Sequence, residues 1–183
     1  MNATGRTYRG LFWALAAAGL LLDLSSKYAV FAWLEPGEAG KYEIIPGVFS
    51  LIHQPELNRG ALFGLGNHHG HLANLVFAAI SATAVGVIVW WSFKPSVAGD
   101  RLLSLALGLI LAGALGNLYD RLVFGGVRDW IWFYWEPHFP RGWPVFNLAD
   151  TWLVCGAGLL LLQAIFARPA AEQAQPNPEV KAA

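Results

Sequence analysis

The side chains in this sequence that could perform chemistry are mainly carboxylates, and they occur beside asparagine, glycine and basic residues. These short polar blocks are separated by long apolar stretches. The candidate residues are Asp23, Lys27, Asn58, Gly60, Asn117, Asp120, Arg121, Asp129, Asn147 and Asp150. The single cysteine, Cys155, lies in an apolar run with no histidine placed to activate it. No recognisable serine nucleophile motif is present, and no histidine or cysteine spacing predicts a metal site.

The chemistry that remains is that of two carboxylates sharing one site. When two such groups lie close together, one pKa rises and the pair holds a single proton. The charged carboxylate then takes a proton from water, and the neutral one donates a proton to a carbonyl oxygen. Nearby asparagine side chains can orient the carboxylates and donate to a developing oxyanion. The polar blocks therefore predict hydrolysis of an amide by general acid–base catalysis, without a covalent intermediate.

Structural roles are open for the same residues. Asn147 and Asp150 can cap a helix, because Asn and Asp are favoured at helix N-termini. Asp120 and Arg121 can form an ion pair that ends a helix at the membrane interface. Composition and spacing alone leave capping and catalysis equally open for Asp150.

The composition indicates that these blocks belong to a membrane protein. Of the 183 residues, 56% are apolar and 13% are charged, whereas soluble domains carry about 25% charged residues. A helix needs about 20 mostly apolar residues to cross a bilayer, and four runs are suitable. These runs are residues 10–34, 72–93, 102–118 and 148–167. The formal net charge is zero, so no nucleic-acid partner is expected.

The first apolar run is expected to remain as a helix rather than to act as a cleaved signal peptide. It is long, and it contains Asp23 and Lys27, which lie four residues apart on one helical face. This spacing favours mutual neutralisation of the two charges inside the membrane. Arg6 and Arg9 precede the run with no acid beside them. They favour a cytoplasmic N-terminus and, with four crossings, a cytoplasmic C-terminus.

The connecting segments are unequal. Residues 35–71 form an outer segment with two expected strands, 42–45 and 48–52, around a Pro-Gly turn. Residues 119–147 form a second outer segment whose aromatic run, 130–135, is expected at the membrane interface. Residues 92–101 form a short inner turn, and the tail 169–183 has a composition typical of disorder. In this arrangement the polar blocks converge on the outer leaflet.

Glycine and alanine recur in the third and fourth apolar runs. Small residues let transmembrane helices approach closely, so we expect close packing there rather than a path for substrate. The residues concerned are Gly108, Ala112, Gly113, Gly116, Gly156 and Gly158.

Five of the polar blocks match short motifs of one known family, in the same order along the chain. They are residues 23–27 (DLSSK), 58–64 (NRGALFG), 113–121 (GALGNLYDR), 127–130 (VRDW) and 146–150 (FNLAD). With these blocks the sequence resembles lipoprotein signal peptidase, the type II signal peptidase of bacteria, over roughly residues 10–166. It departs from the family motifs at Leu62, Arg128 and Trp130, where alanine, an apolar residue and phenylalanine are more common.

The resemblance implies an aspartyl endopeptidase of the bacterial cytoplasmic membrane that needs no metal or organic cofactor. Its substrate would be a prolipoprotein, cut just before a diacylglyceryl-modified cysteine. The catalytic pair carried over from the motifs is Asp129 and Asp150. The residues that would bind substrate or support the site are Asn58, Gly60, Asn117, Asp120, Arg121, Asn147, Asp23 and Lys27.

The expected fold is all-α, with four transmembrane helices and a small extracytoplasmic element that contains β-strands. Residues 1–168 would form one membrane-embedded domain, a monomer in contact with lipid, with a cytoplasmic tail over 169–183. Two other functions stay open. A different intramembrane aspartyl protease is suggested by Tyr119-Asp120, but such enzymes carry both aspartates within helices. A proton-coupled carrier would place polar groups near the midplane, often with inverted repeats, and we find no repeat.

Overall fold

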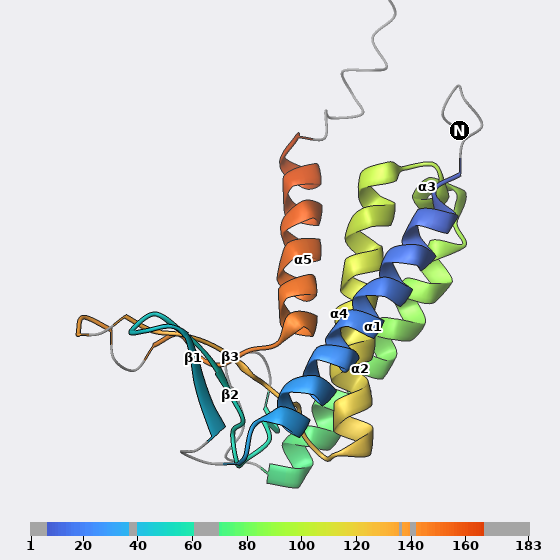
Figure 1. Ribbon diagram of the computed structural model, residues 1–183. Helices are drawn as coiled ribbons and strands as arrows, with labels where there is room; N and C mark the ends of the chain where they lie inside the picture. Colours follow the sequence, from blue (N-terminus) through green and yellow to red (C-terminus); the bar gives the residue numbers. More distant parts are fainter. Residues whose placement is uncertain (1–6, 37–39, 61–69, 136, 140–141, 167–183) are drawn as a thin grey trace, which may run out of the picture.

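Four long helices form a bundle that contains most of the described chain. The computed structural model describes residues 7–36, 40–60, 70–135, 137–139 and 142–166. The long helices are α1 (Arg9–Trp33), α2 (Gly70–Ser92), α4 (Arg101–Val123) and α5 (Leu148–Phe166). Each is long and apolar enough to cross a membrane, which confirms the predicted class. The start of α1 and the end of α5 lie at the same end of the bundle (Figure 1).

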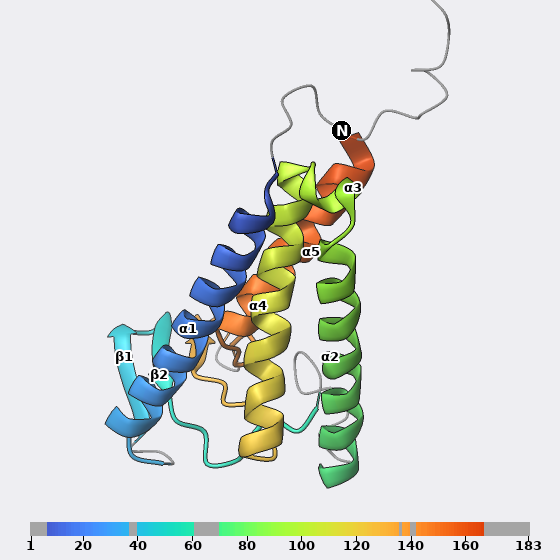
Figure 2. The ribbon, with the colours of Figure 1, turned by 90° about the vertical axis from the view of Figure 1, so that its right-hand side faces the viewer.

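Helix α4 is the central element of the bundle. It packs against α1, α2 and α5, and Figure 2 shows it between α1 and α2. Small residues make the close approach to α5 possible, as predicted. A Cβ atom at Gly113 would collide with the carbonyl oxygen of Ala149, and one at Gly156 would lie 2.7 Å from that of Ala106. The prediction is wrong for Gly158, where an added Cβ would meet nothing within 4 Å.

A small antiparallel sheet lies beside the end of the bundle opposite the N-terminus (Figure 1). Its strands are β1 (Lys41–Ile45), β2 (Phe49–Ile52) and β3 (Ile131–Phe133), in the order β1-β2-β3. The first two strands confirm the predicted pair, and Gly47 supplies the positive φ of 73° in the turn between them. The third strand was not predicted. It lies in the aromatic run, whose residue types also favour strands.

Most helix boundaries agree with the sequence prediction to within two residues, but two features differ more. Helix α4 continues to Val123, past the predicted end at residue 118, because Asp120 and Arg121 are buried with partners rather than solvated at a helix end. The expected inner turn contains a one-turn helix, α3 (Pro95–Ala98), and Asp100 then caps α4 by accepting from the backbone N–H of Leu103. The predicted tail, 169–183, and residues 61–64 of the second motif lie outside the described residues.

Candidate active site

The predicted polar residues gather around the first turn of α5, where that helix meets α1 and α4. They come from α1, α4, α5, the segment that follows β2, and the segments before and after β3. Most are buried, with 8% or less of their surface exposed: Asp23, Lys27, Asn117, Asp120, Arg121, Asp129, Asn147 and Asp150. Polar groups buried to this degree need partners, and the hydrogen bonds show how they are arranged.

Asn147 and Asp150 cap α5 reciprocally. The Oδ1 atom of Asn147 accepts from the backbone N–H of Asp150 at 2.9 Å, and Oδ2 of Asp150 accepts from the backbone N–H of Asn147 at 3.3 Å. This exchange is the geometry of a capping box. The side-chain nitrogen of Asn147 also donates to Oδ1 of Asp129 at 2.7 Å. One residue therefore caps the helix and holds both carboxylates of the predicted pair.

Two further asparagines each bind the carboxylate oxygen that Asn147 leaves free. Asn117 donates to Oδ1 of Asp150 at 2.8 Å, and Asn58 donates to Oδ2 of Asp129 at 2.9 Å. The backbones of Asn58 and Val127 exchange both hydrogen bonds, which brings the segment before Asp129 alongside Asn58. Each oxygen of the two carboxylates thus accepts an N–H bond that orients it.

Lys27 connects the site to the interior of the bundle. Its ammonium nitrogen lies 2.8 Å from Oδ2 of Asp23, 3.4 Å from Oδ2 of Asp120 and 3.2 Å from Oδ1 of Asn117. The predicted pairing of Asp23 with Lys27 is therefore present. Asp23 has a second partner, because its Oδ1 accepts from the backbone N–H of Ala149 at 2.8 Å. Such a bond satisfies a free donor in the first turn of α5.

Asp120 forms its ion pairs with Lys27 and Arg128. Its Oδ1 lies 2.7 Å from Nη2 of Arg128, and its Oδ2 accepts from the backbone N–H of Arg128 at 2.9 Å. The sequence showed Arg128 only as a departure from a motif, so this partnership was missed. An arginine next to the predicted catalytic Asp129 was the available signal.

Arg121 turns toward a different part of the site. Its Nη2 donates to the carbonyl oxygen of Gly60 at 2.7 Å, and its Nη1 donates to that of Asn117 at 3.3 Å. Asn74 of α2 donates to the carbonyl of Arg121 at 3.1 Å and is 3% exposed. The sequence reading did not single out Asn74, because it is an isolated asparagine in an apolar run. These bonds tie the 58–60 segment and α2 to the end of α4.

The buried charges of this cluster do not balance unless one proton is added. Among the described residues the buried acids are Asp23, Asp120, Asp129 and Asp150, and the buried bases are Lys27, Arg121 and Arg128. The acids exceed the bases by one, and an unpaired buried charge is costly. Burial, and next the charge of Asp150, raise the pKa of Asp129 to about 7, against the opposing hydrogen bonds of Asn58 and Asn147. A proton shared by Asp129 and Asp150 makes the cluster neutral.

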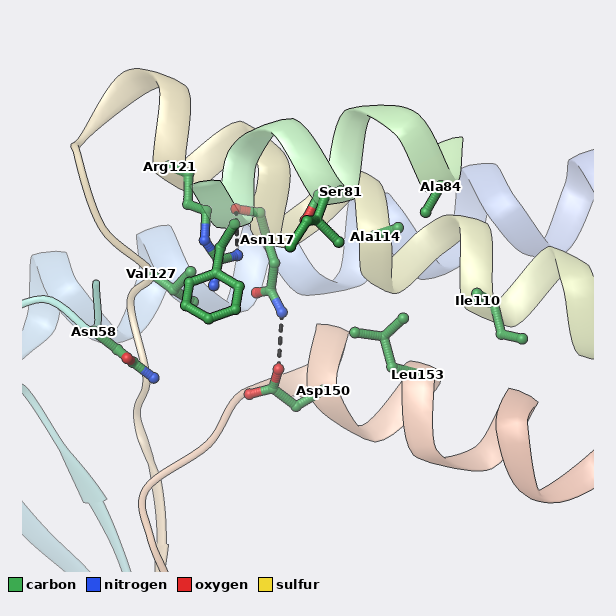
Figure 3. Close-up of a pocket in the computed structure, with 12 residues that line it drawn as sticks. Asn58, Ser81, Ala84, Ile110, Ala114, Asn117, Arg121, Val127, Asp150 and Leu153 are labelled. Atoms are coloured by element: carbon green, nitrogen blue, oxygen red, sulfur yellow. Dashed lines mark hydrogen bonds between the residues drawn. The ribbon is translucent and has the colours of Figure 1, made fainter. Parts of the chain in front are cut away.

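A cavity of about 260 Å³ opens beside these carboxylates, between α2, α4 and α5. Figure 3 shows Asn117, Arg121 and Asp150 at one end, with Ala84 and Ile110 farther along it. The cavity is therefore polar at the end lined by Asp150, Asn117 and Arg121 and mainly apolar beyond it. Such an arrangement suits hydrolysis of a substrate that is partly apolar.

Comparison with known proteins gives a consistent result. The family model described as signal peptidase (SPase) II matches residues 15–166. The chain is similar to the lipoprotein signal peptidase of Rhodopirellula baltica, with 46% identity over 84% of this chain and 70% of that protein. It is 40% identical to the lipoprotein signal peptidase of Aeromonas hydrophila over 84% of this chain and 87% of that one.

Two solved structures, both titled as bacterial membrane enzymes, share the fold. One has a TM-score of 0.74 at 26% identity and covers 87% of this chain and 90% of its own. The other has a TM-score of 0.71 at 25% identity and covers 89% of this chain and 97% of its own.

Proposed function

This chain belongs to the signal peptidase II family, an aspartic peptidase family that removes signal peptides from prolipoproteins, and we propose that Asp129 and Asp150 are the carboxylates that perform the cleavage. Membership of this family decides against a carrier and against other classes of intramembrane aspartyl protease. The observation that carries the proposal is the position of Asn147, whose amide and backbone bind both carboxylates at once.

The chemistry follows from a pair that holds one proton. The ionised carboxylate takes a proton from water, whose oxygen attacks the scissile carbonyl carbon, while the neutral carboxyl donates its proton to the carbonyl oxygen. When the tetrahedral intermediate collapses, the C–N bond breaks and the leaving nitrogen receives the proton that came from water. The other proton returns to the carboxylate that donated it, so the pair again holds one proton.

The remaining candidates are proposed to support this pair. Asn58, Asn117 and Asn147 orient the carboxylates through the bonds described above. Arg121 lines the cavity and donates to the carbonyl oxygen of Gly60, and its Nε atom is buried without a partner among the described residues. Asp23, Lys27 and Asp120 hold the ends of α1, α4 and α5 together.

The proposed substrate carries a diacylglyceryl group on the cysteine that follows the cut. The cavity suits this chemistry because its polar end lies at Asp150 and Asn117, whereas Ala84, Ile110 and Leu153 continue it as an apolar wall. An acyl chain or the apolar part of the signal peptide can lie along that wall while the scissile peptide reaches the carboxylates.

We further propose a topology. Residues 1–168 form one monomeric peptidase domain in the bacterial inner membrane, in contact with lipid. Both termini and the tail 169–183 face the cytoplasm, and the catalytic pair faces the outer leaflet. Helix α5 runs from its first turn, which contains Asp150, to an end that lies at the same end of the bundle as the start of α1, which is consistent with Arg9 at the inner surface. Reporter domains fused after Phe166 and within β1–β2 should report opposite sides, and the same side for both would reject this topology.

The catalytic assignment is tested by cleavage of a diacylated prolipoprotein in vitro, with the unlipidated precursor alongside. Asp129→Asn and Asp150→Asn should each abolish cleavage while the protein still inserts into membranes. Glu35→Gln is the matched control, because Glu35 is an exposed acid before the sheet and should leave activity unchanged. Full activity in either aspartate variant would reject the pair.

A further inference from the structure

Arg128 binds Asp120 through both its main chain and its side chain. The backbone N–H donates to Oδ2 of Asp120 at 2.9 Å, and the guanidinium donates to Oδ1 from Nη2 at 2.7 Å and from Nε at 3.2 Å. Both side chains are almost fully buried, at 4% and 0% exposure. Charge-assisted bonds with this fork geometry are among the strongest hydrogen bonds in proteins.

Aromatic rings enclose the same guanidinium. Its central carbon lies 4.2 Å from the ring centroid of Phe124 and 4.3 Å from that of Tyr28, with Phe31 at 5.9 Å. Tyr28 and Phe31 belong to α1, and Phe124 directly follows α4. The rings hold a cation by cation–π attraction while keeping water from it. Arg128 is thus fixed between two helices, and Asp129 is the next residue in the chain.

The second consequence of the Arg128 bond concerns Lys27. This ammonium lies 2.8 Å from Asp23 and donates to Oδ1 of Asn117 at 3.2 Å, while Asp120 is farther, at 3.4 Å. Asn117 in turn donates to Asp150. Without Arg128, Asp120 would be a buried carboxylate with Lys27 as its only ion-pair partner among the described residues. The ammonium would move toward Asp120 and away from Asn117.

We propose that Arg128 is a positioning residue for the catalytic pair: by neutralising Asp120 it keeps Lys27 on Asn117, and it fixes the segment that carries Asp129. This inference rests on the proposed function, because it assumes that Asp129 and Asp150 catalyse the cleavage. Arg128 acts on Asp129 through the main chain that joins the two residues. It acts on Asp150 through the contacts of Asp120, Lys27 and Asn117.

The charge of Arg128 also bears on proton sharing. The charged groups around the pair are Asp23 and Lys27 from α1, Asp120 and Arg121 from α4, and Arg128. The exposed Arg59, on the segment of Asn58, lies near Gly70 and Gly126. Removal of Arg128 leaves one more negative charge uncompensated in this group. The added negative potential favours the protonated form, so the pair should lose its proton at higher pH. A residue with a purely structural role would not cause this shift.

The test is a double-mutant cycle on the purified full-length enzyme, read as kcat, KM and the pH dependence of cleavage. The variants are Arg128→Met, Asp120→Asn and the two together. Methionine keeps the apolar stem between the rings and removes the charge. Arg128→Lys restores the charge without the fork. Arg101→Met is the control, since Arg101 is an exposed arginine at the start of α4.

We expect Arg128→Met to lower kcat by about 100-fold, the order of loss that follows a misplaced catalytic group, with a smaller change in KM. Its activity should extend to higher pH than that of the wild type. Arg128→Lys should recover part of the kcat loss. The double variant should be more active than Arg128→Met, and its pH profile should return toward the wild type, because removal of both charges restores the balance and releases Lys27.

The inference is wrong if Arg128→Met keeps wild-type kcat and pH dependence. It is also wrong if the loss in the double variant equals or exceeds that of Arg128→Met with no shift in pH dependence, since Arg128 would then act only through packing. If the Arg128→Met protein does not accumulate in cells, the kcat and pH dependence of Arg128→Lys and of the double variant test the inference in the same way. Failure of the proposed function would give a different result, because Asp129→Asn would then still cleave the precursor, with or without a substitution at Arg128.

Discussion

The side-chain nitrogen of Asn147 lies 2.7 Å from Oδ1 of Asp129, although 18 positions separate the two residues along the chain. Asn147 is at the same time the N-cap of α5, through its bond to the backbone of Asp150. Capping and the proposed catalytic role, which are alternatives in the sequence, therefore involve the same residues. When α5 forms its first turn, the helix cap and the carboxylate pair are assembled together.

Substitution of Asn147 should separate these two roles. Asn147→Ser keeps a capping oxygen but removes the amide that donates to Asp129. Its thermal stability should exceed that of Asn147→Ala, because serine caps helices about as well as asparagine. Its kcat should fall by roughly 100-fold, since Asp129 loses an orienting bond. Asn147→Ala should show the same loss of kcat and a further loss of stability. Wild-type kcat in Asn147→Ser would show that the bond to Asp129 is not needed for catalysis.

The activity should have an upper pH limit set by Asp129. Burial, and next the charge of Asp150, raise the pKa of this carboxyl from 3.8 to about 7. The pair must hold one proton to act as acid and base, so kcat/KM should fall as the pH rises through about 7. Lys27 opposes the rise in the pKa of Asp129, so Lys27→Met should move this limit to higher pH. A pH profile that stays flat through neutral pH would contradict a shared proton.

The same pKa predicts how stability changes with pH. A carboxyl whose pKa is higher in the folded protein binds protons more tightly when folded. Its contribution to stability is fully present below pH 3.8 and is lost as the pH rises toward about 7. The midpoint of thermal unfolding in detergent should therefore fall over this window in the wild type. Asp129→Asn should weaken that dependence, and an unchanged dependence in Asp129→Asn would assign the effect to other groups.

The sequence predicted the helices and the polar cluster well, because both are local signals. Long apolar runs mark the four helices, and the order of five short motifs brought Asp129 and Asp150 forward as a pair. The sequence predicted the end of α4 too early, because an aspartate such as Asp120 is usually exposed to water. Its burial depends on Arg128, which comes after the helix has ended.

Contacts that depend on the fold itself could not be predicted. Nothing in an isolated asparagine indicates that Asn74 binds the carbonyl of Arg121 from another helix. Pairing of β3 with β2 likewise depends on where the bundle places the segment after α4, because aromatic residues suit both a strand and a membrane interface. Sequence therefore predicted which residues lie together, and the structure shows which residue each one binds.

The cavity should control access to the catalytic pair. Ala84 of α2 lines its apolar part, whereas Ala82, two residues earlier, is exposed on the same helix. Ala84→Phe should fill part of the 260 Å³ and raise KM for a lipidated precursor, with a smaller effect on kcat. Ala82→Phe adds the same ring facing lipid and should leave KM unchanged. Equal effects of the two substitutions would indicate that the substrate does not use this cavity.

Gly116 of α4 should be difficult to replace, because the carboxylate of Asp23 lies directly against it. A Cβ atom there would collide with Oδ2 of Asp23 and lie 3.0 Å from its Cγ, and 3.3 Å from the side chain of Ala149. Asp23 cannot move away freely, since its two oxygens bind Lys27 and the backbone N–H of Ala149. Gly116→Ala should therefore displace the start of α5 and lower both kcat and the thermal midpoint.

Gly158→Ala is the matched control for this prediction. Gly158 is also a helical glycine, but a Cβ there meets nothing within 4 Å. Alanine favours a helix over glycine by about 1 kcal/mol, so Gly158→Ala should keep full activity and leave the thermal midpoint equal or higher. The cost of Gly116→Ala would then reflect the displaced carboxylate of Asp23 rather than the change from glycine to alanine. Full activity in Gly116→Ala would show that the observed position of Asp23 is not needed to align α5 with the proposed catalytic pair.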